Sequence, residues 1–514
     1  MHSSGNTTAI GAISCGCSNR AVNYSFVNQI LHFFFTIKPP ANMKIKLCLL
    51  GHLAKTARNA FISYHSATSL LMNKSKSCSY SSRHLHSVRH CRSLSCGSLP
   101  LSSLEYHFHK YSTDAKENIL LTHIKTRIKI YGPLTVASYM KEVLTNAHSG
   151  YYMHRDVFGT EGDFITSPEI SQLFGEMLGV WVVNEWMNHY KDKIQVIELG
   201  PGRGTLADDM LRVFSQFPDI IDKVSLHLVE VSPKLSLMQA AKLSGKNVSE
   251  TNDENSGIVD EASKEMGCYQ QCTSRYGPQV YWYKELADVP QGLSCFIAHE
   301  FLDALPIHKF HKIDKGWREV MIDVDPINDS LRFVLAPGQT PASIAFLKDL
   351  ASDEKTNFEV CPAAGIIVQD ICKRIKRNNG FALLADYGHS GEKGGTFRAF
   401  KNHQLHDPLE EPGTADLTAD VDFSYLKQFV DNDVKVFGPI TQERFLNNMG
   451  IGFRLQVLLQ KSSQDQWSSL ISGYRMLTSP EQMGERFKFM SIMNRVGDGY
   501  MPAGFANLDL GKKF

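Results

Sequence analysis

The chain has 514 residues, 54 Lys and Arg against 53 Asp and Glu, and 43% hydrophobic residues. This composition excludes a disordered polyelectrolyte and is sufficient for a large buried core. No window of about 18 uninterrupted apolar residues is present, so we expect no integral membrane span. The near-neutral total hides a division, because residues 1–110 hold 12 Lys and Arg and a single acid, Glu105, and have a net charge of +11. The remaining residues hold 42 Lys and Arg and 52 Asp and Glu, a net charge of −10.

Residues 1–110 are acid-poor and rich in Ser, Arg and His. This composition is typical of a mitochondrial transit peptide, so we predict import into the mitochondrial matrix and removal of the segment. A disordered tail, or a true start at Met43, is the alternative interpretation. The spacing of the remaining cysteines, which follow residue 110, favours neither a disulfide framework nor a zinc site, and we expect no metal.

Residues 111–190 are predicted to form an N-terminal helical region. Two helices are expected within 117–147, with a break before Thr135, which would cap the second helix. A longer helix is expected after Ser167-Pro168-Glu169, with Ser167 as its cap. Its apolar residues recur at helical spacing, and we interpret them as core packing. They are Ile170, Leu173, Phe174, Met177, Leu178, Trp181 and Val182.

The part of the chain from residue 191 to 514 is predicted to hold a parallel sheet. Short apolar runs alternate there with amphipathic helical stretches such as Leu206–Phe217, and this alternation is typical of a doubly wound α/β fold. The expected strands are Ile194–Leu199, Leu226–Val231, Val280–Tyr283, Cys295–Ala298 and Phe381–Ala385.

Two insertions are expected in this alternation. The first, residues 243–266, is rich in Ser, Asn, Asp and Glu and is predicted to be a flexible acidic segment. The second, residues 307–380, begins with an antiparallel unit of three strands, Ile307–Ile313, Trp317–Val324 and Leu331–Leu335. Val434–Phe437 and Leu455–Leu459 are candidates for the strands that close the main sheet.

A glycine loop follows the first expected strand, in the sequence Glu198-Leu199-Gly200-Pro201-Gly202-Arg203-Gly204. Glycines at alternate positions allow a sharp turn and a close approach to a ligand, and the helix that follows offers free N–H groups. A Walker loop is excluded because no Gly-Lys-Ser/Thr is present. A dinucleotide loop is excluded because Thr205 occupies the position of its third glycine.

A second acid, Glu230, ends the next expected strand. An acid at this position can accept hydrogen bonds from both hydroxyls of a ribose, so the strand end and the glycine loop together indicate an adenosyl ligand. The carboxylate of Glu198 beside the loop suits a ligand with a cationic end. S-Adenosylmethionine has a sulfonium and an α-amino group. We therefore predict that it binds at Glu198, Gly200, Pro201, Gly202, Gly204 and Glu230.

An acidic turn follows the fourth expected strand, in His299-Glu300-Phe301-Leu302-Asp303. The carboxylates of Glu300 and Asp303 can converge on a cationic guanidinium, which prefers bidentate oxygen partners. A helix cap beside a solvated acid is the alternative interpretation. A zincin site is excluded, because Asp303 replaces the second histidine of that motif. Asp386-Tyr387-Gly388 ends the next strand and is expected to line the same crevice.

Taken together in this order, these motifs resemble the MidA-like methyltransferases, whose mitochondrial members form the complex I assembly factor 7 family. The resemblance extends from about Ile119 to Phe505. It implies a class I, Rossmann-like methyltransferase sheet over residues 191–514, with S-adenosylmethionine as cofactor. Departures from the family are the long N-terminal segment, the insertion at 243–266, and His299, where family members usually have Asn.

The resemblance also implies an activity and a partner. These are symmetric (type II) dimethylation of an arginine on an iron–sulfur protein subunit of complex I, during assembly. Glu300, Asp303 and His299 are the candidate catalytic residues: the two acids would orient the guanidinium, and His299 would accept its proton. A non-catalytic assembly chaperone that binds the cofactor, or a small-molecule methyltransferase, remains the alternative. Nucleic acid is not expected as a partner of an acidic body, and the oligomeric state stays open.

Overall fold

The computed structural model describes residues 118–154, 165–246, 267–347, 355–494, 496–497 and 499–506, all of which belong to one compact unit. The predicted targeting segment, residues 1–110, lies outside the described residues. So does most of the predicted acidic insertion, of which only residues 243–246 are described. None of the helices in the described ranges is both long enough and apolar enough to cross a membrane.

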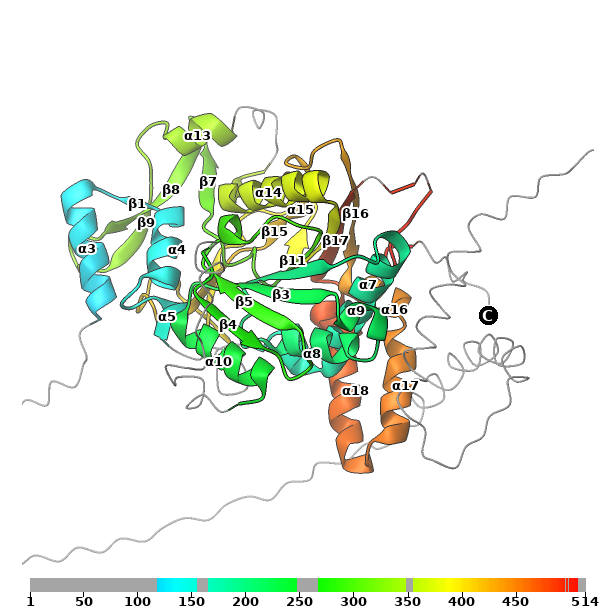
Figure 1. Cartoon of the computed structure of the whole chain (residues 1–514). Coiled ribbons are helices and arrows are strands. Elements are labelled where there is room, and N and C mark those ends of the chain that lie inside the picture. Colours follow the sequence, from blue (N-terminus) through cyan, green and yellow to red (C-terminus); the bar gives the residue numbers. More distant parts are fainter. Residues whose placement is uncertain are drawn as a thin grey trace, which may run out of the picture. The chain divides into compact units, whose positions relative to one another are not determined.

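A nine-stranded sheet forms the centre of the described structure (Figure 1), with strand order β16-β17-β11-β6-β2-β3-β5-β4 and with β15 paired to β11. The five strands expected from the sequence are all present and run parallel. They are β2 (Ile194–Leu199), β3 (Val224–Val229), β5 (Gln279–Tyr283), β6 (Ser294–His299) and β11 (Gly380–His389). The other members are β4 (Gln270–Thr273), β15 (Val421–Asp422), β16 (Val434–Thr441) and β17 (Phe487–Asn494). The predicted doubly wound, Rossmann-like class is confirmed.

Strand β2 is the topological switch point of this sheet. The chain proceeds from β2 to β3 and β5 on one side and then returns to β6 and β11 on the other. In open parallel sheets, ligands bind at the carboxyl ends of the strands beside such a reversal. The glycine loop follows β2 and the acidic turn follows β6, so the fold brings the two predicted sites to the same edge.

Both faces of the sheet are covered, as the continuous apolar runs of its strands require. In β11, Phe381 and Leu383 pack on one face, whereas Ala382 and Leu384 pack on the other. The first face contacts α7 (Gln172–His189) and α8 (Thr205–Phe214), and the second contacts α14 (Pro362–Asn378). All residues of the predicted core stripe in α7 are buried, and Ile170, which precedes it, is half-buried.

The N-terminal helical region agrees in part with the prediction. Helices α3 (Ile119–Tyr131) and α4 (Val136–Thr145) are present, and the Thr135 hydroxyl caps α4 by accepting from the Ser138 N–H at 3.0 Å. The prediction that Ser167 caps the long helix is wrong. Ser167 begins a single turn, α6 (Ser167–Ile170), and Ser171 caps α7 with its hydroxyl. The hydroxyl of Ser167 is engaged elsewhere, in the candidate site described below.

The prediction of a strand at Leu455–Leu459 is wrong. These residues lie in α17 (Ile451–Lys461), which packs against α18 (Gln464–Thr478) and α7. A short apolar run does not by itself distinguish a strand from a buried helix. The strand that closes the sheet with β16 is β17, which no expectation named.

A second sheet of five antiparallel strands contains the three strands expected within 307–335. They are β7 (His308–Ile313), β8 (Gly316–Val324) and β9 (Leu331–Leu335), joined by β10 (Asn357–Val360) and by β1 (Leu134–Thr135). Helices α3 and α4 pack on this sheet. Because α14 packs on the main sheet, we propose that the inserted unit is residues 308–360, shorter than the expected 307–380.

A third sheet, in the order β13-β12-β14, lies between β11 and β15 in the chain. Its strands are β12 (Arg398–Lys401), β13 (Gln404–His406) and β14 (Asp416–Thr418). The remaining helices of the described residues are α5 (Tyr151–His154), α9 (Pro218–Ile221), α10 (Pro233–Ser244), α13 (Pro341–Phe346), α15 (Phe423–Lys427), α16 (Gln442–Asn448) and the short turns Leu286–Asp288 and Pro480–Gly484.

Candidate active site

The glycine loop connects β2 to α8 in a backbone conformation that favours glycine. Gly200, Gly202 and Gly204 have φ values of +64°, +53° and +74°, in the left-handed region that residues with a Cβ rarely adopt. At Gly200 a Cβ would also lie 2.7 Å from the ring of Phe301. The loop is fixed by hydrogen bonds from the Gly200 N–H to the Val229 carbonyl, at 3.1 Å, and from the Gly204 N–H to the Pro201 carbonyl, at 2.8 Å.

Glu198, near the end of β2, is a buried acid without a full set of partners. Its residue is 3% exposed, and its Oε2 has no hydrogen-bond partner among the described residues. Burial raises the pKa of Glu198 to about 8, because the charged form is poorly solvated there. A buried carboxylate oxygen of this kind is a suitable acceptor for a cationic ligand.

Glu230 directly follows β3 and is held by two hydrogen bonds. Its Oε1 accepts from the Ser232 N–H at 2.8 Å, and its Oε2 accepts from Gln239 Nε2 at 3.0 Å. Burial raises the pKa of Glu230 to about 7, although these hydrogen bonds oppose the shift. Each carboxylate oxygen keeps a further acceptor position, so the side chain is oriented without being saturated.

Gln239 of α10 is a site residue that sequence reasoning missed. Its Nε2 donates to the Gly202 carbonyl at 2.7 Å as well as to Glu230, and its Oε1 accepts from Trp282 Nε1 at 2.8 Å. One buried amide therefore fixes the glycine loop relative to the acid of the neighbouring strand. A glutamine inside an amphipathic helix has no sequence signal that distinguishes it from an ordinary polar position.

The acidic turn begins at Glu300, whose φ of +48° turns the chain away from β6. Its side chain is 6% exposed, and its Oε1 accepts from both the N–H and the hydroxyl of Ser167, at 3.0 and 3.1 Å. His299 Nε2 lies 3.1 Å from the same oxygen, and the His299 ring packs 4.7 Å from that of Phe174. The side chains of Glu300 and His299 are thus in contact.

Asp303, at the end of the turn, is 6% exposed. Its Oδ2 accepts from the hydroxyl of Thr418 in β14 at 2.7 Å. Burial and the neighbouring Glu300 carboxylate raise the pKa of Asp303 to about 6, against the opposing effects of the Thr418 hydrogen bond and the Arg398 charge. Neither acid of the turn is solvated, and no helix begins between them, so the geometry differs from that of a helix cap beside a solvated acid.

Asp386 of β11 holds the acidic turn in place. Its Oδ2 accepts from the backbone N–H groups of residues 301, 302 and 303, at 3.2, 2.9 and 3.3 Å. Burial and the nearby carboxylates of Asp303 and Glu300 raise its pKa. Glu300, Asp303 and Asp386, called the unpaired cluster below, form no ion pair with a lysine or arginine in the parts of the chain that the structure describes.

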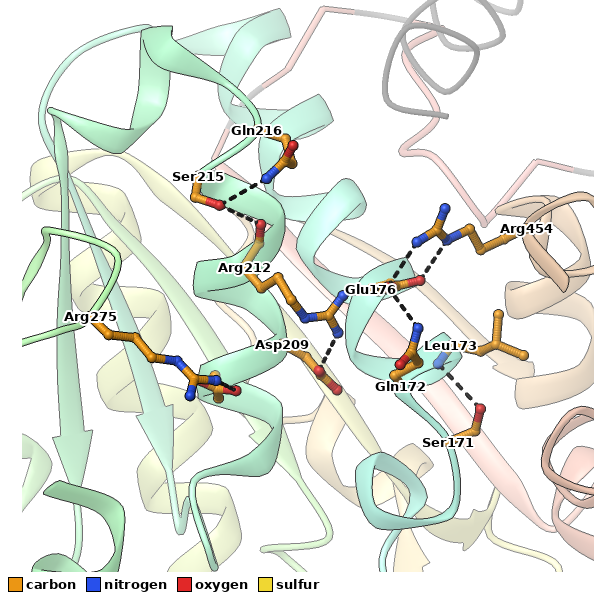
Figure 2. A network of polar contacts seen from close by, with 11 residues as sticks. Ser171, Gln172, Leu173, Glu176, Asp209, Arg212, Ser215, Gln216, Arg275 and Arg454 are labelled. Carbon is orange, nitrogen blue, oxygen red and sulfur yellow. Dashed lines mark hydrogen bonds and ion pairs between the residues drawn. The ribbon is translucent and has the colours of Figure 1, made fainter. Parts of the chain in front are cut away.

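A second group of acids, on the helical layer that supports the glycine loop, is fully paired (Figure 2). Glu176 of α7 is 0% exposed and accepts from Arg454 Nε of α17 at 2.6 Å and from Arg212 Nη1 of α8 at 2.5 Å. Arg212 Nη2 also donates to Asp209 at 2.5 Å. Two acids and two guanidinium groups, called the paired cluster below, thus join three helices, one of which begins at the glycine loop.

Helices α7 and α8 approach closely at this cluster. A Cβ added to Gly175 would overlap the side chain of Asp209, and one added to Gly179 would lie 2.9 Å from that of Val213. These two glycines on one face of α7 therefore allow α8, and with it the glycine loop, to lie against the helix.

The residues at the edge of the sheet fit S-adenosylmethionine. Glu198 offers a buried acceptor without a partner, the backbone at Gly200 leaves no room for a side chain, and Glu230 presents an oriented carboxylate at the end of β3. The six residues predicted to bind the cofactor all belong to β2, the loop that follows it and the end of β3. The three candidate catalytic residues all lie at the end of β6, the strand next to β2.

Comparisons with known proteins agree with this geometry. Residues 177–440 match a family model described as "Putative S-adenosyl-L-methionine-dependent methyltransferase". The chain is 52% identical to the mitochondrial protein arginine methyltransferase NDUFAF7 of Xenopus laevis, over 73% of this chain and 84% of that protein. It is 50% identical to the human protein of the same name, over 73% of this chain and 83% of that protein.

The solved structures include a Burkholderia thailandensis protein bound to S-adenosyl-homocysteine. It has a TM-score of 0.60 and 24% sequence identity to this chain, and the match covers 76% of this chain and 94% of that protein. This likeness shows the fold and is independent of the sequence matches to the animal proteins.

Proposed function

The chain belongs to the S-adenosylmethionine-dependent methyltransferase family that includes the mitochondrial NDUFAF7 proteins, and from this premise we propose that it methylates an arginine side chain of a protein. S-Adenosylmethionine is its cofactor and supplies the methyl group from its sulfonium. The observation that carries the proposal is the unpaired cluster, where buried carboxylates lie at the cofactor edge without a lysine or arginine partner among the described residues.

The side chains at this edge suit the handling of a guanidinium. Carboxylates bind a guanidinium through paired, charge-assisted hydrogen bonds that fix its orientation. We assign this role to Glu300, which Ser167 orients, and to Asp303, which Thr418 orients. Their negative charge also stabilises the positive charge of the dimethylated product and of the transition state that leads to it.

The guanidinium group is protonated in water, so a proton must leave as the nitrogen is methylated. We propose that His299 accepts it, because His299 Nε2 lies 3.1 Å from Oε1 of Glu300, the carboxylate that would orient the guanidinium. Asp386 acts through the backbone of the turn and is a positioning residue.

The finer assignment follows from the family resemblance. We propose that the product is symmetric dimethylarginine, that the substrate is an iron–sulfur protein subunit of complex I during assembly, and that the enzyme works in the mitochondrial matrix. The names of the relatives describe mitochondrial protein arginine methyltransferases, and the basic residues 1–110 have the composition of a targeting segment.

Replacing Glu300 by Gln tests the proposed function. The variant should bind S-adenosylmethionine with unchanged affinity in a calorimetric titration. Transfer of labelled methyl groups to mitochondrial protein should fall by roughly 100-fold or more, the effect of removing one preorganised electrostatic group. Mass spectrometry of the product of the unmodified enzyme then distinguishes symmetric from asymmetric dimethylarginine.

The exposed acid Asp329, changed to Asn, is the matched control and should leave transfer unchanged. Wild-type transfer by Glu300→Gln would refute the assigned role of the acidic turn. If the unmodified chain binds the cofactor but transfers no methyl group to any mitochondrial protein, the chain is a cofactor-binding chaperone and the proposed activity is wrong.

A further inference from the structure

A pocket of about 290 Å³ lies next to the unpaired cluster, and its charge has the opposite sign. Three cationic side chains line it, those of Lys393, Arg398 and Arg486, together with a single acid, Asp420. The rings of Tyr387 and Phe400 form apolar parts of its wall. Asp420 pairs with Arg398 at 2.7 Å and with Lys393 at 3.1 Å, so the pocket keeps an excess of positive charge.

Two connections place this pocket beside the acidic turn. Tyr387 lines the pocket, and burial followed by the charges of Glu300 and Asp303 raises the pKa of its hydroxyl, which therefore lies near the acidic turn. Arg398 of β12 is the cross-strand partner of Thr418 in β14, whose hydroxyl binds Asp303. Side chains of directly opposed residues extend from the same face of a sheet. Arg398 and Thr418 therefore extend toward the same side.

The guanidinium of Arg398 is only partly used by its contacts within the chain. Its Nη1 contacts Asp420 and donates to the Thr396 carbonyl at 2.8 Å, whereas its Nε and Nη2 have no hydrogen-bond partner among the described residues. The carbon of the guanidinium lies 5.7 and 5.6 Å from the ring centres of Tyr387 and Phe400. These cation–π contacts hold the guanidinium beside the two rings. The edge left without partners is buried, and it is the edge with which a guanidinium binds a carboxylate side-on through two parallel hydrogen bonds.

Arg486 adds a second cation that is available to a ligand. It is exposed, and its side chain has no ion pair with any residue in the described part of the chain. Its backbone carbonyl accepts from the Gly388 N–H at 3.1 Å, which ties it to the same strand, β11, that supplies Asp386 and Tyr387. Strand β11 thus contacts both the acidic turn, through Asp386, and the cationic pocket, through Tyr387.

We propose that this pocket binds the carboxylate of an acidic residue in the protein substrate, close in sequence to the methylated arginine. This inference rests on the proposed function and adds a substrate class to it: a segment in which an arginine and an Asp or Glu occupy neighbouring subsites of opposite charge. Peptides that bear a lysine or arginine at the position of the acid are rejected, because the pocket would then face like charge.

The test uses short synthetic peptides, each with one arginine and with Glu, Gln or Lys placed in turn at every flanking position. For each peptide, kcat/KM for methyl transfer from S-adenosylmethionine and the dissociation constant in the presence of S-adenosyl-homocysteine are measured. The unmodified enzyme should prefer Glu to Gln about 10-fold or more at one position, the effect expected of a charge-assisted hydrogen bond, and should disfavour Lys there.

Two variants test which residues of the pocket cause the preference for Glu. Arg398→Gln keeps a planar group against the two rings and should reduce the Glu preference to less than about threefold. Arg486→Glu should reverse it, so that the peptide with Lys becomes the better substrate. Arg377→Gln, at an exposed position on α14, is the control and should keep the wild-type preference.

The outcomes separate this inference from the proposed function. Equal turnover of the Glu and Gln peptides at every position would overturn the inference and leave the arginine methyltransferase activity intact. Peptides that bind in a Glu-dependent and Arg398-dependent manner without being methylated would overturn the activity and support the pocket. Neither binding nor methylation of any peptide would overturn both.

Discussion

The paired cluster and the unpaired cluster contain the same kind of side chain in similarly buried surroundings, yet they differ in what balances the charge. Glu176 and Asp209 face two guanidinium groups across three helices (Figure 2). Among the described residues, Glu300, Asp303 and Asp386 are held by backbone N–H groups and hydroxyls, with one histidine in contact with Glu300. The charges of the paired cluster are therefore balanced within the fold. For the unpaired cluster, we propose that the guanidinium of the substrate supplies the balancing charge.

The difference has an energetic consequence. In a buried ion pair, the attraction between the two charges offsets much of their desolvation cost. Removing one partner leaves the other charge buried without compensation. Burial raises the pKa of Asp209 in the paired cluster and of Asp303 in the unpaired cluster, each to about 6. The main effect that opposes the shift is the charge of Arg212 at Asp209, but only the Thr418 hydrogen bond at Asp303. The first arrangement holds helices together, whereas the second lowers stability and, in the proposed function, leaves carboxylates available to a guanidinium. Two substitutions, one in each cluster, test this contrast, and a third tests Glu198 in the predicted cofactor site.

Replacing Arg454 by Met should give the largest effect. The change removes two hydrogen bonds to Glu176 and leaves a fully buried carboxylate with one guanidinium instead of two. The free energy of unfolding should fall by about 3–5 kcal/mol, measured by urea denaturation. Lys461→Met, at an exposed position on the same helix, is the control. A loss below about 1 kcal/mol would show that the paired cluster is not a structural clamp.

Replacing Asp303 by Asn should increase the free energy of unfolding. The pKa of Asp303 is raised from 3.8 to about 6 in the folded chain, so ionisation of this carboxyl costs stability at high pH. Because a tenfold change in proton affinity corresponds to about 1.4 kcal/mol, the variant should be more stable by about 1–3 kcal/mol at pH 8. Thr418 can still donate its hydroxyl to the Asn oxygen. Methyl transfer should nevertheless be lost, which separates stability from activity.

The pH dependence of this gain follows from the raised pKa. Well below pH 3.8, Asp303 is protonated in both the folded and the unfolded chain, so the two proteins should approach equal stability. As the pH rises from about 4 to 6, the unfolded chain loses this proton first, so the wild type loses stability and the variant does not. Thermal unfolding at pH 4 and pH 8 checks this. A variant less stable than the wild type at pH 8 would contradict the contrast between the clusters.

Replacing Glu198 by Gln should give the smallest effect. The pKa of Glu198 is raised to about 8, and a cationic cofactor binds more tightly to the ionised form. The affinity of the wild type for S-adenosylmethionine should therefore rise by up to about tenfold between pH 7 and pH 9, relative to the Gln variant. Calorimetric titration of both proteins at each pH gives the comparison. Parallel pH profiles would show that Glu198 does not titrate on binding.

The sequence predicts the sites that are formed by neighbours in the chain. The glycine loop, the acid of Glu230 and the turn from Glu300 to Asp303 are contiguous motifs, and the alternation of strands and helices brings them to one edge. The parts that sequence reasoning missed are contacts between distant residues. The local sequence at Ser167 indicates a helix cap, although its hydroxyl binds Glu300, which is 133 positions away. Thr418 binds Asp303 across 115 positions, and no local pattern identifies either partner.

The wrong prediction of the strand that closes the main sheet has the same cause. Phe487–Asn494 and Leu455–Leu459 are both short apolar runs, and periodicity does not distinguish them. Their structures are decided by what they contact. Residues 455–459 lie against α18 and α7, whereas β17 fits between β11 and β16. Tertiary packing therefore selects helix or strand where local preference is weak.

The position of β17 also constrains how the chain can be made. Although β17 is the last strand among the described residues, it is an interior strand, and it pairs with β11 on one side and β16 on the other. During synthesis, the edges of both neighbours therefore stay unpaired on that side until Phe487–Asn494 emerges, and such edges are prone to pair with other chains. A premature stop codon anywhere before Phe487 would leave a sheet with a gap in its middle. Completion of the main sheet thus depends on a strand that is translated after both of its neighbours.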